Sequence, residues 1–332
     1  MATPIVTIPG DGIGPEVMAA AQTVLQAAGA DITWVDAEAG LGAAEKFGDP
    51  LPPATLDLIR RYRVALKGPC TTPLGKGFRS INVRLRQELD LFASVRPVQS
   101  LPGIRVPYQN VDLVVVRENT EGLYSGQEHV VVKGVVESLR IVTRAAAERI
   151  VRFAFELARH QGRRQVTFCH KADVLPMSDG LFLSIARAVA DDYPFLQFGE
   201  LHVDALCMQL ALDPTRFDVL VMENLFGDVL SDLCAGLVGG LGLVPGANIG
   251  TRYALFEAVH GSAPDIAGKG LANPIALIRS AALMLQHIGQ ARTAQKIEMA
   301  VGKTLLGGTG LTRDLGGEGT TATISEQLVA NL

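Results

Sequence analysis

Short apolar runs alternate with amphipathic stretches along most of the chain. The first run, Pro4 to Pro9, is rich in β-branched residues and ends at a glycine-rich turn, after which Glu16 to Ala28 is predicted to be helical. Further strands are predicted at residues 64–66, 113–116, 165–169, 197–203 and 219–222, with helices at 145–160 and 180–191. Because helices then alternate with apolar strands, we expect an α/β fold with a buried, mostly parallel sheet.

Three segments depart from this alternation. Ser125 to Val142 has strand-like residues with no intervening helix, so it is predicted to be an antiparallel excursion able to pair with a second subunit. Gly236 to Gly250 and Leu91 to Pro97 are predicted to be crossings between domains. A chain of 332 residues is also long enough for two cores, so we expect two domains with a cleft between them.

Composition restricts the classes of function. The chain is 48% hydrophobic and 19% charged, which is typical of a globular protein, and its net charge of −4 gives no broad basic surface for nucleic acid. Its four cysteines are far apart, without metal or disulfide spacing. No targeting leader or membrane-spanning run is visible, so we expect a soluble, cytoplasmic protein with no membrane partner.

Two carboxylates carry the strongest local signal. Asp228 and Asp232 are four residues apart on a predicted helix, so they project from one face. Two like charges at this spacing repel one another, and a divalent cation with oxygen ligands, Mg²⁺ or Mn²⁺, would resolve the repulsion. The alternative for an isolated pair is two solvated carboxylates near a helix end.

Arginines form a second cluster, in Arg79 to Arg86, at Arg96 and at Arg117. Guanidinium groups pair with carboxylates through two parallel hydrogen bonds, so converging arginines suit a substrate with two or three carboxylates. Ser80 and Asn82 would add neutral hydrogen bonds. Taken singly, each arginine is typical of a surface ion pair, but Arg117 follows an apolar run at the predicted end of a strand, where α/β ligand sites open.

Tyr124 and Lys171 are candidates for proton transfer, because a lysine in a closed cleft can have a lowered pKa and a tyrosine can pass a proton. The turn Gly10 to Gly14 fits neither the GxGxxG pattern nor a P-loop. A loop from Glu257 to Pro274 has small residues and backbone donors that suit a dinucleotide, although His260 in it suits a structural turn equally well.

Seven motifs in order together resemble the isocitrate and isopropylmalate dehydrogenase family, from about Pro4 to the C-terminal region. They are IPGDGIGPEV, RSINVRLRQELDLFASVRP, VVRENTEGLYSGQEH, SDGLF, DALCMQL, ENLFGDVLSDLCAGLVGGLGLVPGANIG and FEAVHGSAPDIAGKGLANP. The resemblance implies a two-domain α/β subunit without the usual dinucleotide fold. Residues 1–95 and 240–332 would form the large cofactor-binding domain. Residues 96–239 would form a small domain with the metal site, the dimer interface and a clasp-like segment at about 125–142.

The resemblance also implies a homodimer with active sites shared between subunits. Asp228 and Asp232 of one chain and Asp204 of its partner would bind Mg²⁺ or Mn²⁺, and Lys171 would come from the partner. The reaction implied is oxidation and decarboxylation of D-isocitrate to 2-oxoglutarate and CO₂, in which Lys171 takes the hydroxyl proton and Tyr124 returns a proton to carbon. The substrate would contact Ser80, Asn82, Arg86, Arg96 and Arg117.

Substrate and cofactor preference rest on two short segments. Ser80, Asn82 and Arg86 match the isocitrate pattern and would be poor neighbours for an isopropyl group, because an unpaired buried polar group costs about 1 to 3 kcal/mol. The carboxylate in Asp265-Ile266 would accept ribose hydroxyls and repel a 2′-phosphate, which favours NAD over NADP. The remaining cofactor contacts implied are Thr72, Glu257, His260, Gly261, Ser262, Ala263 and Asn273.

One residue departs from the family pattern. Lys171-Ala-Asp173 stands where many members have asparagine as the third residue, and Val174 to Met177 also differs. These departures keep two alternatives open: a homoisocitrate or other 2-hydroxy acid β-decarboxylating dehydrogenase, and a non-catalytic regulatory subunit. The presence of every implied catalytic and metal-binding residue argues against the regulatory subunit.

Overall fold

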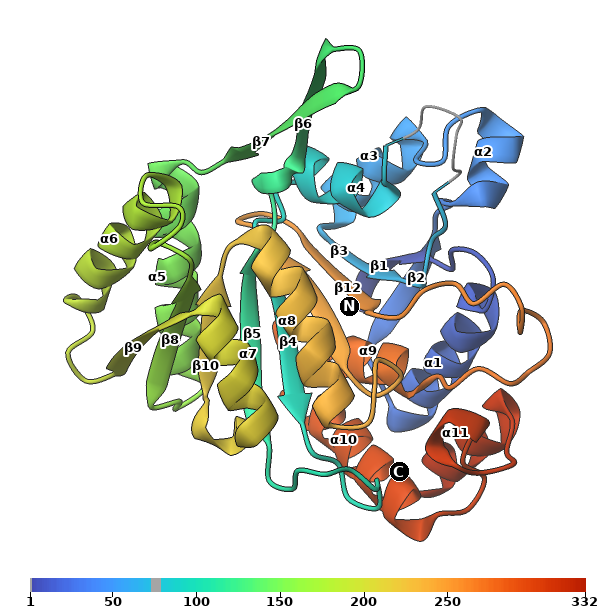
Figure 1. Cartoon of the computed structure of the whole chain (residues 1–332). Helices are drawn as coiled ribbons and strands as arrows, with labels where there is room; N and C mark the ends of the chain where they lie inside the picture. Colours follow the sequence, from blue (N-terminus) through green and yellow to red (C-terminus); the bar gives the residue numbers. More distant parts are fainter. Residues whose placement is uncertain (1, 73–78) are drawn as a thin grey trace.

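The computed structural model describes residues 2–72 and 79–332. One ten-stranded sheet runs through the molecule (Figure 1). Its strands in spatial order are β2 (Ile32–Asp36), β1 (Thr3–Ile8), β3 (Val64–Lys67), β12 (Ala254–Ala258), β11 (Pro245–Ile249), β4 (Ala93–Gln99), β5 (Asp112–Glu118), β10 (Val219–Met222), β8 (Gln165–His170) and β9 (Gln197–His202).

The sheet is parallel on both flanks and antiparallel in its centre. β11 runs antiparallel to β12 and to β4, and β4 runs antiparallel to β5. The segments 91–97 and 236–250, which the sequence indicated only as crossings, thus supply the two central strands. Both carry residues unusual in a central strand, Pro97 in β4 and Pro245-Gly246 in β11, so neither shows the continuous apolar run that marked the parallel strands.

Helices cover both faces of the sheet, and alternate strand residues feed cores on opposite faces. In β5, Val114 and Val116 join one core, whereas Leu113 and Val115 join the other. The first face carries α1 (Gly14–Ala28), α5 (Arg144–His160), α6 (Ser178–Ala190) and α9 (Ile275–His287), with α10 (Ala291–Gly307) and α11 (Thr321–Ala330) outside them. The second carries α3 (Pro53–Tyr62), α4 (Ile81–Glu88), α7 (Val203–Leu212) and α8 (Asn224–Leu237).

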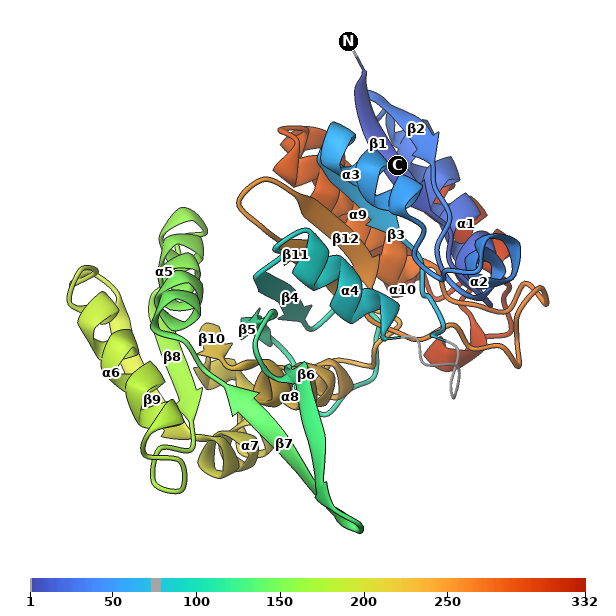
Figure 2. The same ribbon diagram turned by 90° about the horizontal axis from the view of Figure 1, so that it is seen from above.

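The central strands lie between two groups of helices. Figure 2 shows β11, β4 and β5 between one half with α5 and α6 and another with α1, α3 and α9. A short helix, α2 (Leu41–Phe47), lies in the second half. On the first half β9 ends at His202, and Val203, expected to be extended, instead begins α7.

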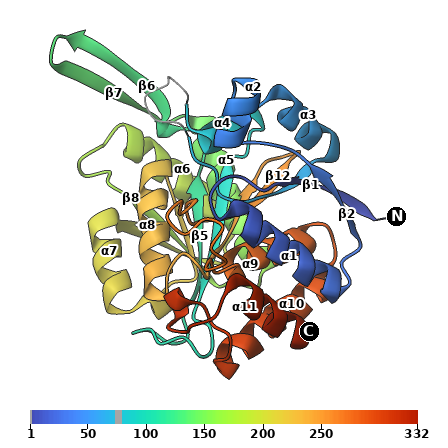
Figure 3. The same cartoon turned by 90° about the vertical axis from the view of Figure 1, so that its right-hand side faces the viewer.

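A two-stranded hairpin projects from the body of the molecule (Figure 3). It consists of β6 (Gly122–Val132) and β7 (Val135–Ile141), and it confirms the antiparallel excursion expected near residues 125–142. Apolar side chains along it are open to solvent: Val130 is 67% exposed and Val136 is 63% exposed. Because an isolated two-stranded ribbon is only marginally stable in water, this apolar surface favours contact with another chain.

Across the part of the chain that the structure describes, no helix has the length and apolar character needed to cross a bilayer.

Candidate active site

A cleft of about 250 Å³ opens between α4 and α8, above the central strands β4 and β11. It brings together ten of the residues predicted from the sequence: Ser80, Asn82, Arg86, Arg96, Tyr124, Asp228, Asp232, Glu257, His260 and Gly261. The strands contribute side chains at their ends, and the helices contribute side chains from one face. Residues from distant parts of the chain therefore meet where the sheet changes from parallel to antiparallel.

The two carboxylates of α8 face arginines. Asp228 and Asp232 lie on one face of the helix, as predicted, and Arg96 donates a hydrogen bond to Asp232 over 2.9 Å. Arg117 and Tyr124 both pair with Asp228. Burial alone would raise the pKa of Asp228, but Arg117, the Tyr124 hydroxyl and Arg96 outweigh it and hold the pKa below its usual range. The repulsion expected from the sequence is therefore offset within the chain by cations.

Positive charge nevertheless exceeds what these carboxylates offset. Burial, followed by repulsion from Arg117 and Arg96, lowers the pKa of Arg86 to about 10. Nε of Arg86 and Oδ1 of Asn82 are buried without a hydrogen-bond partner among the described residues. Buried polar groups are rarely left unpaired, so the cleft is suited to a ligand with an anionic group that accepts from Arg86 and a donor, such as a hydroxyl, for Oδ1 of Asn82.

Arg117 is held in place from three sides. It lies at the end of β5 and is only 1% exposed. Its Nε and Nη2 donate to Oδ1 of Asn224 over 3.0 and 2.6 Å, and its guanidinium lies 4.9 Å from the centre of the Tyr124 ring. Gly227 of α8 provides the space, since a Cβ there would stand 2.5 Å from Cγ of Arg117.

Gly227→Ala is therefore expected to displace Arg117, destabilising the protein by about 1–3 kcal/mol through overpacking and lowering turnover at least tenfold. Gly236→Ala is the matched control on the same helix, because a Cβ at Gly236 meets nothing within 4 Å. It should be neutral or slightly stabilising. Urea unfolding and steady-state kinetics of both variants make the comparison, and equal behaviour of the two would contradict the packing role of Gly227.

A buried ion pair forms the floor of the cleft. Lys67, at the end of β3, lies 2.7 Å from Oε2 of Glu257, and both side chains are almost fully buried. Asn248 of β11 donates to Oε1 of Glu257 over 2.7 Å. Burial would raise the pKa of Glu257, but the charges of Lys67 and Arg86, with hydrogen bonds from Lys67 and Asn248, bring it to about 2. Sequence reasoning overlooked Lys67, although its signal, a cation ending an apolar run, is the one that identified Arg117.

A second, apolar pocket of about 530 Å³ adjoins the cleft through His260 and Gly261. It is lined by Ala263, Ile266 and Asn273 from the predicted cofactor set, and by Ile13, Arg313 and Asp314, which sequence reasoning missed. Asn273 donates to Asp314 over 2.9 Å. Burial lowers the pKa of His260, and its Nε2 has no partner in the described part of the chain. An apolar slot with a few polar groups suits a flat heteroaromatic ring.

The glycine-rich turn Gly10 to Gly14 joins the loops around this pocket. Asp11 accepts hydrogen bonds from the amides of Leu41 and Thr71 over 2.8 and 2.6 Å, and Ile13 donates to the carbonyl of Ser262 over 2.9 Å. Gly12 has a φ of +60°, and a Cβ there would lie 1.9 Å from that carbonyl oxygen. The glycines thus permit close packing of three loops, which explains why the turn matches no phosphate-binding motif.

Thr72 and Asp265 lie beside these pockets without lining them. Oγ1 of Thr72 accepts a hydrogen bond from the amide of Ile81 over 3.1 Å, so Thr72 fixes the start of α4. Asp265 is exposed in the turn that follows Ala263, next to Ile266.

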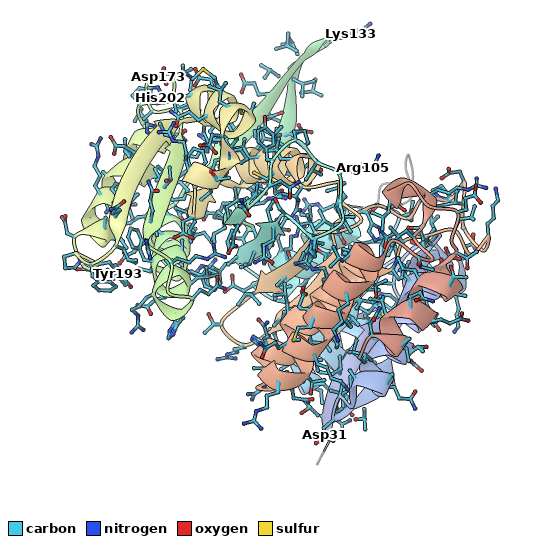
Figure 4. All side chains as sticks on the ribbon, turned by 90° about the horizontal axis from the view of Figure 1, so that it is seen from below. Asp31, Arg105, Lys133, Asp173, Tyr193 and His202 are labelled. Carbon is cyan, nitrogen blue, oxygen red and sulfur yellow. The ribbon has the colours of Figure 1, made fainter. Side chains whose placement is uncertain are left out.

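Lys171 and Asp204 do not line the cleft of their own chain. Nζ of Lys171 lies 3.0 Å from Asp204 and 3.1 Å from Asp173, and these two carboxylates raise its pKa, opposite to the lowering expected in a closed cleft. Figure 4 shows Asp173 and His202 at one corner of the molecule. Among the described residues, no group of three or more His, Cys, Asp or Glu side chains is placed to hold a metal ion. One chain therefore presents only two of the three predicted metal ligands at its cleft.

Comparison with known proteins places this geometry in context. The family model described as isocitrate/isopropylmalate dehydrogenase matches residues 4–328. A probable NAD isocitrate dehydrogenase subunit alpha of Drosophila melanogaster is 49% identical over 330 residues, covering 99% of this chain and 87% of the relative. NAD isocitrate dehydrogenase catalytic subunit 5 of Arabidopsis thaliana is 50% identical over 333 residues, covering 99% and 89%. The crystal structure of isocitrate dehydrogenase from Methylococcus capsulatus has a TM-score of 0.96 and 52% identity, covering 100% of this chain and 99% of that one.

These names correct one expectation. The Drosophila and Arabidopsis relatives are mitochondrial proteins, so the cytoplasmic location expected from the sequence is wrong. The expectation rested on the lack of a visible targeting leader and on cysteines without pairing. Unpaired cysteines separate a reducing from an oxidising compartment, but they do not separate one reducing compartment from another.

Proposed function

This chain belongs to the isocitrate/isopropylmalate dehydrogenase family, and we propose that it oxidises and decarboxylates D-isocitrate with NAD. The observation that carries the proposal is the convergence of Arg86 and Arg96 in one cleft, with the buried Arg117 directly behind it against Asp228. Their combined charge suits a substrate with several carboxylates, and Oδ1 of Asn82, which has no partner among the described residues, would make an apolar isopropyl group a poor neighbour. Relatives named as NAD isocitrate dehydrogenase subunits support the same substrate and cofactor.

The oxygen donors of Asp228 and Asp232 fit a hard divalent cation, and Asp204 of a second copy would complete the set with Mg²⁺ or Mn²⁺. Such an ion supplies Lewis acidity at the substrate hydroxyl and at the enolate oxygen left by decarboxylation. NAD would occupy the apolar pocket beside His260, with Asn273 toward its adenine and Thr72 near the nicotinamide, which accepts the hydride.

The chain's own residues would divide the remaining work. Arg86, Arg96 and Arg117 would orient the carboxylates. Ser80 and Asn82 would contact the third carboxylate, which distinguishes isocitrate from isopropylmalate. Lys171 of a second copy would receive the hydroxyl proton. Tyr124 would deliver a proton to carbon after CO₂ leaves, and burial together with its bond to Asp228 raises the pKa of this tyrosine, which keeps it protonated.

A homodimer with shared sites is supported by what one chain leaves exposed. Lys171 and Asp204 lie outside the cleft, while apolar residues are open to solvent on the hairpin and on the outer faces of α7 and α8, among them Met208, Leu212 and Val229. We retain the division into residues 1–95 with 240–332 and residues 96–239, because Arg96, Arg117 and the two carboxylates of α8 would then face Arg86 and the cofactor loops across the central strands.

Cofactor preference is tested at Asp265 and Ile266. Replacing them by Lys and Tyr removes a carboxylate that would repel a 2′-phosphate and introduces a cation that would attract it. We expect the ratio of kcat/KM for NAD to that for NADP to fall by about 100-fold, or roughly 3 kcal/mol. An unchanged ratio would refute the assignment of this segment to the adenosine ribose.

The proposed reaction is tested with a panel of isocitrate, homoisocitrate, isopropylmalate, malate and tartrate, each with NAD or NADP and with or without Mn²⁺. We expect NADH formation with isocitrate that depends on Mn²⁺ and little turnover of isopropylmalate. If the enzyme prefers homoisocitrate, the proposed substrate is wrong, but the proposed oxidation and decarboxylation stand. Inactivity with every compound, together with stimulation of a partner dehydrogenase, would identify a regulatory subunit.

A further inference from the structure

Arg140 is a nearly buried cation at the foot of the hairpin, outside the cleft. It lies near the end of β7, and its side chain is only 14% exposed. The tip of the same hairpin, at Lys133, lies far from the body of the molecule (Figure 4). Arg140 therefore belongs to the part of the hairpin that packs against the helices, where its guanidinium meets the start of α6 and the start of α8.

One side of the guanidinium leads to Lys171. Nη1 of Arg140 pairs with the buried carboxylate of Asp179 and donates to Oγ of Ser178 over 3.1 Å. The other oxygen of Asp179 accepts a hydrogen bond from the backbone amide of Lys171 over 2.6 Å. Asp179 thus connects Arg140 to the backbone of the residue proposed to take the substrate proton.

The other side leads to the helix with the proposed metal ligands. Nη2 of Arg140 lies 3.6 Å from Oε2 of Glu223, the N-cap residue of α8, whose Oε1 accepts the amide of Phe226 over 2.8 Å. The guanidinium also lies 5.5 Å from the centre of the Phe226 ring. Asp228 and Asp232 follow on the next turns of this helix, so the position of its first turn sets theirs.

We propose that Arg140 is a positioning residue that connects the Lys171 backbone to the start of α8 within one chain. The inference rests on the proposed function, in which active sites are shared: Lys171 serves the second copy's cleft, whereas Asp228 and Asp232 serve their own. Each Arg140 then links two active sites of the dimer. Arg140 offsets two buried carboxylates, Asp179 and Glu223, so its removal leaves both uncompensated and loosens both connections.

Mixed dimers separate the two connections. Copies with different affinity tags are produced together, and dimers of one wild-type and one Lys171→Met chain are isolated as the reference. Their single working site combines the carboxylates of the Lys171→Met chain with Lys171 of the other. Arg140→Met is then introduced into one chain or the other of this dimer, and Arg140→Lys serves as the conservative variant. The control is Arg187→Met on α6, because the ion pair of Arg187 with Glu200 is exposed.

We expect a 10- to 100-fold effect on the chain that supplies Asp228 and Asp232, as is usual for groups that orient metal ligands, and an effect of at least tenfold on the chain that donates Lys171. On the chain that donates Lys171, Arg140→Met should lower kcat with little change in the KM for isocitrate. On the other chain it should weaken Mn²⁺ activation. Arg140→Lys should restore part of each effect, and Arg187→Met should match the reference. An effect in neither placement, or in only one, would overturn the proposal.

Hydrogen exchange tests the connection without the reaction. In the Arg140→Met homodimer the amides of Lys171 and Phe226 should exchange at least tenfold faster than in the wild type, and in Arg187→Met they should not. Unchanged protection of either amide would overturn the inference whatever the substrate proves to be. An inactive reference dimer would instead contradict the proposed function, so the two failures are distinguishable.

Discussion

Asp228→Asn is expected to lower kcat/KM for isocitrate by about 1,000-fold, or roughly 4 kcal/mol of transition-state stabilisation. Asparagine has the same shape, but its one side-chain oxygen can accept from only one of Arg117 and Tyr124, and it removes the negative charge that would bind Mg²⁺ or Mn²⁺. The core beneath α8 is formed by Leu230, Cys234 and neighbouring apolar residues, so the fold should persist.

Two measurements are needed, turnover over a range of Mn²⁺ concentrations and direct titration of Mn²⁺ binding by calorimetry. The variant should need a higher Mn²⁺ concentration in both. Asp192→Asn is a suitable control, because that carboxylate pairs with Arg152 on the exposed surface. If the variant has wild-type turnover and unchanged affinity for Mn²⁺, Asp228 is not a ligand of the proposed metal site.

Lys67→Met is expected to destabilise the protein by about 3–5 kcal/mol at pH 7, because it leaves the Glu257 carboxylate buried beside a neutral side chain. Arg86, 3.8 Å from Glu257, is too far to replace the direct contact. Adding Glu257→Gln removes the uncompensated charge, so the double variant should be more stable than Lys67→Met alone. Urea unfolding followed by fluorescence of the single tryptophan, Trp34, measures both. A double variant no more stable than the single one would refute this account.

The same pair predicts a pH dependence. In the wild type the pKa of Glu257 is about 2, below the ordinary glutamate value of about 4.3, so the stability it contributes is complete above about pH 4.3 and is lost as the pH falls toward 2. Without Lys67, we expect burial, which is the largest cause acting on this carboxyl, to outweigh Arg86 and Asn248 and raise the pKa, so that the variant gains stability by taking up a proton. The difference in the free energy of unfolding between the wild type and Lys67→Met should therefore be largest near pH 7 and should become smaller toward pH 4.

Local patterns predicted the parallel flanks of the sheet and much of the cleft. The sequence indicated Arg117 and Lys171 because each follows a buried apolar run. In the structure Arg117 lies at the end of β5, and Lys171 directly follows β8. Asp228 and Asp232 were identified by helical spacing, and they share one helix face. Such signals are contained in a few neighbouring residues, so one sequence is enough to find them.

The remaining features depend on contacts between distant segments. Lys67 carries the same signal as Arg117, but its importance comes from Glu257, which only folding brings to it. Likewise, the turn with Asp11 fits neither nucleotide-binding pattern, and the role of Asp11, which is to accept amides from two other loops, appears only after folding. The strands β4 and β11 lack a continuous apolar run, and their position is set by partners on both sides.

The continuity of the sheet determines how the cleft can change width. Its two walls, α4 and α8, stand on the same face of the sheet over different strands, and these strands belong to one continuous hydrogen-bonded sheet in the described part of the chain. Between these walls, β11 and β4 pair through only three residues, Ala247 to Ile249, whereas β4 and β5 pair along their whole length. A change in the width of the cleft would therefore have to be taken up by twisting in this short ladder, because it is the shortest of the pairings between the two walls.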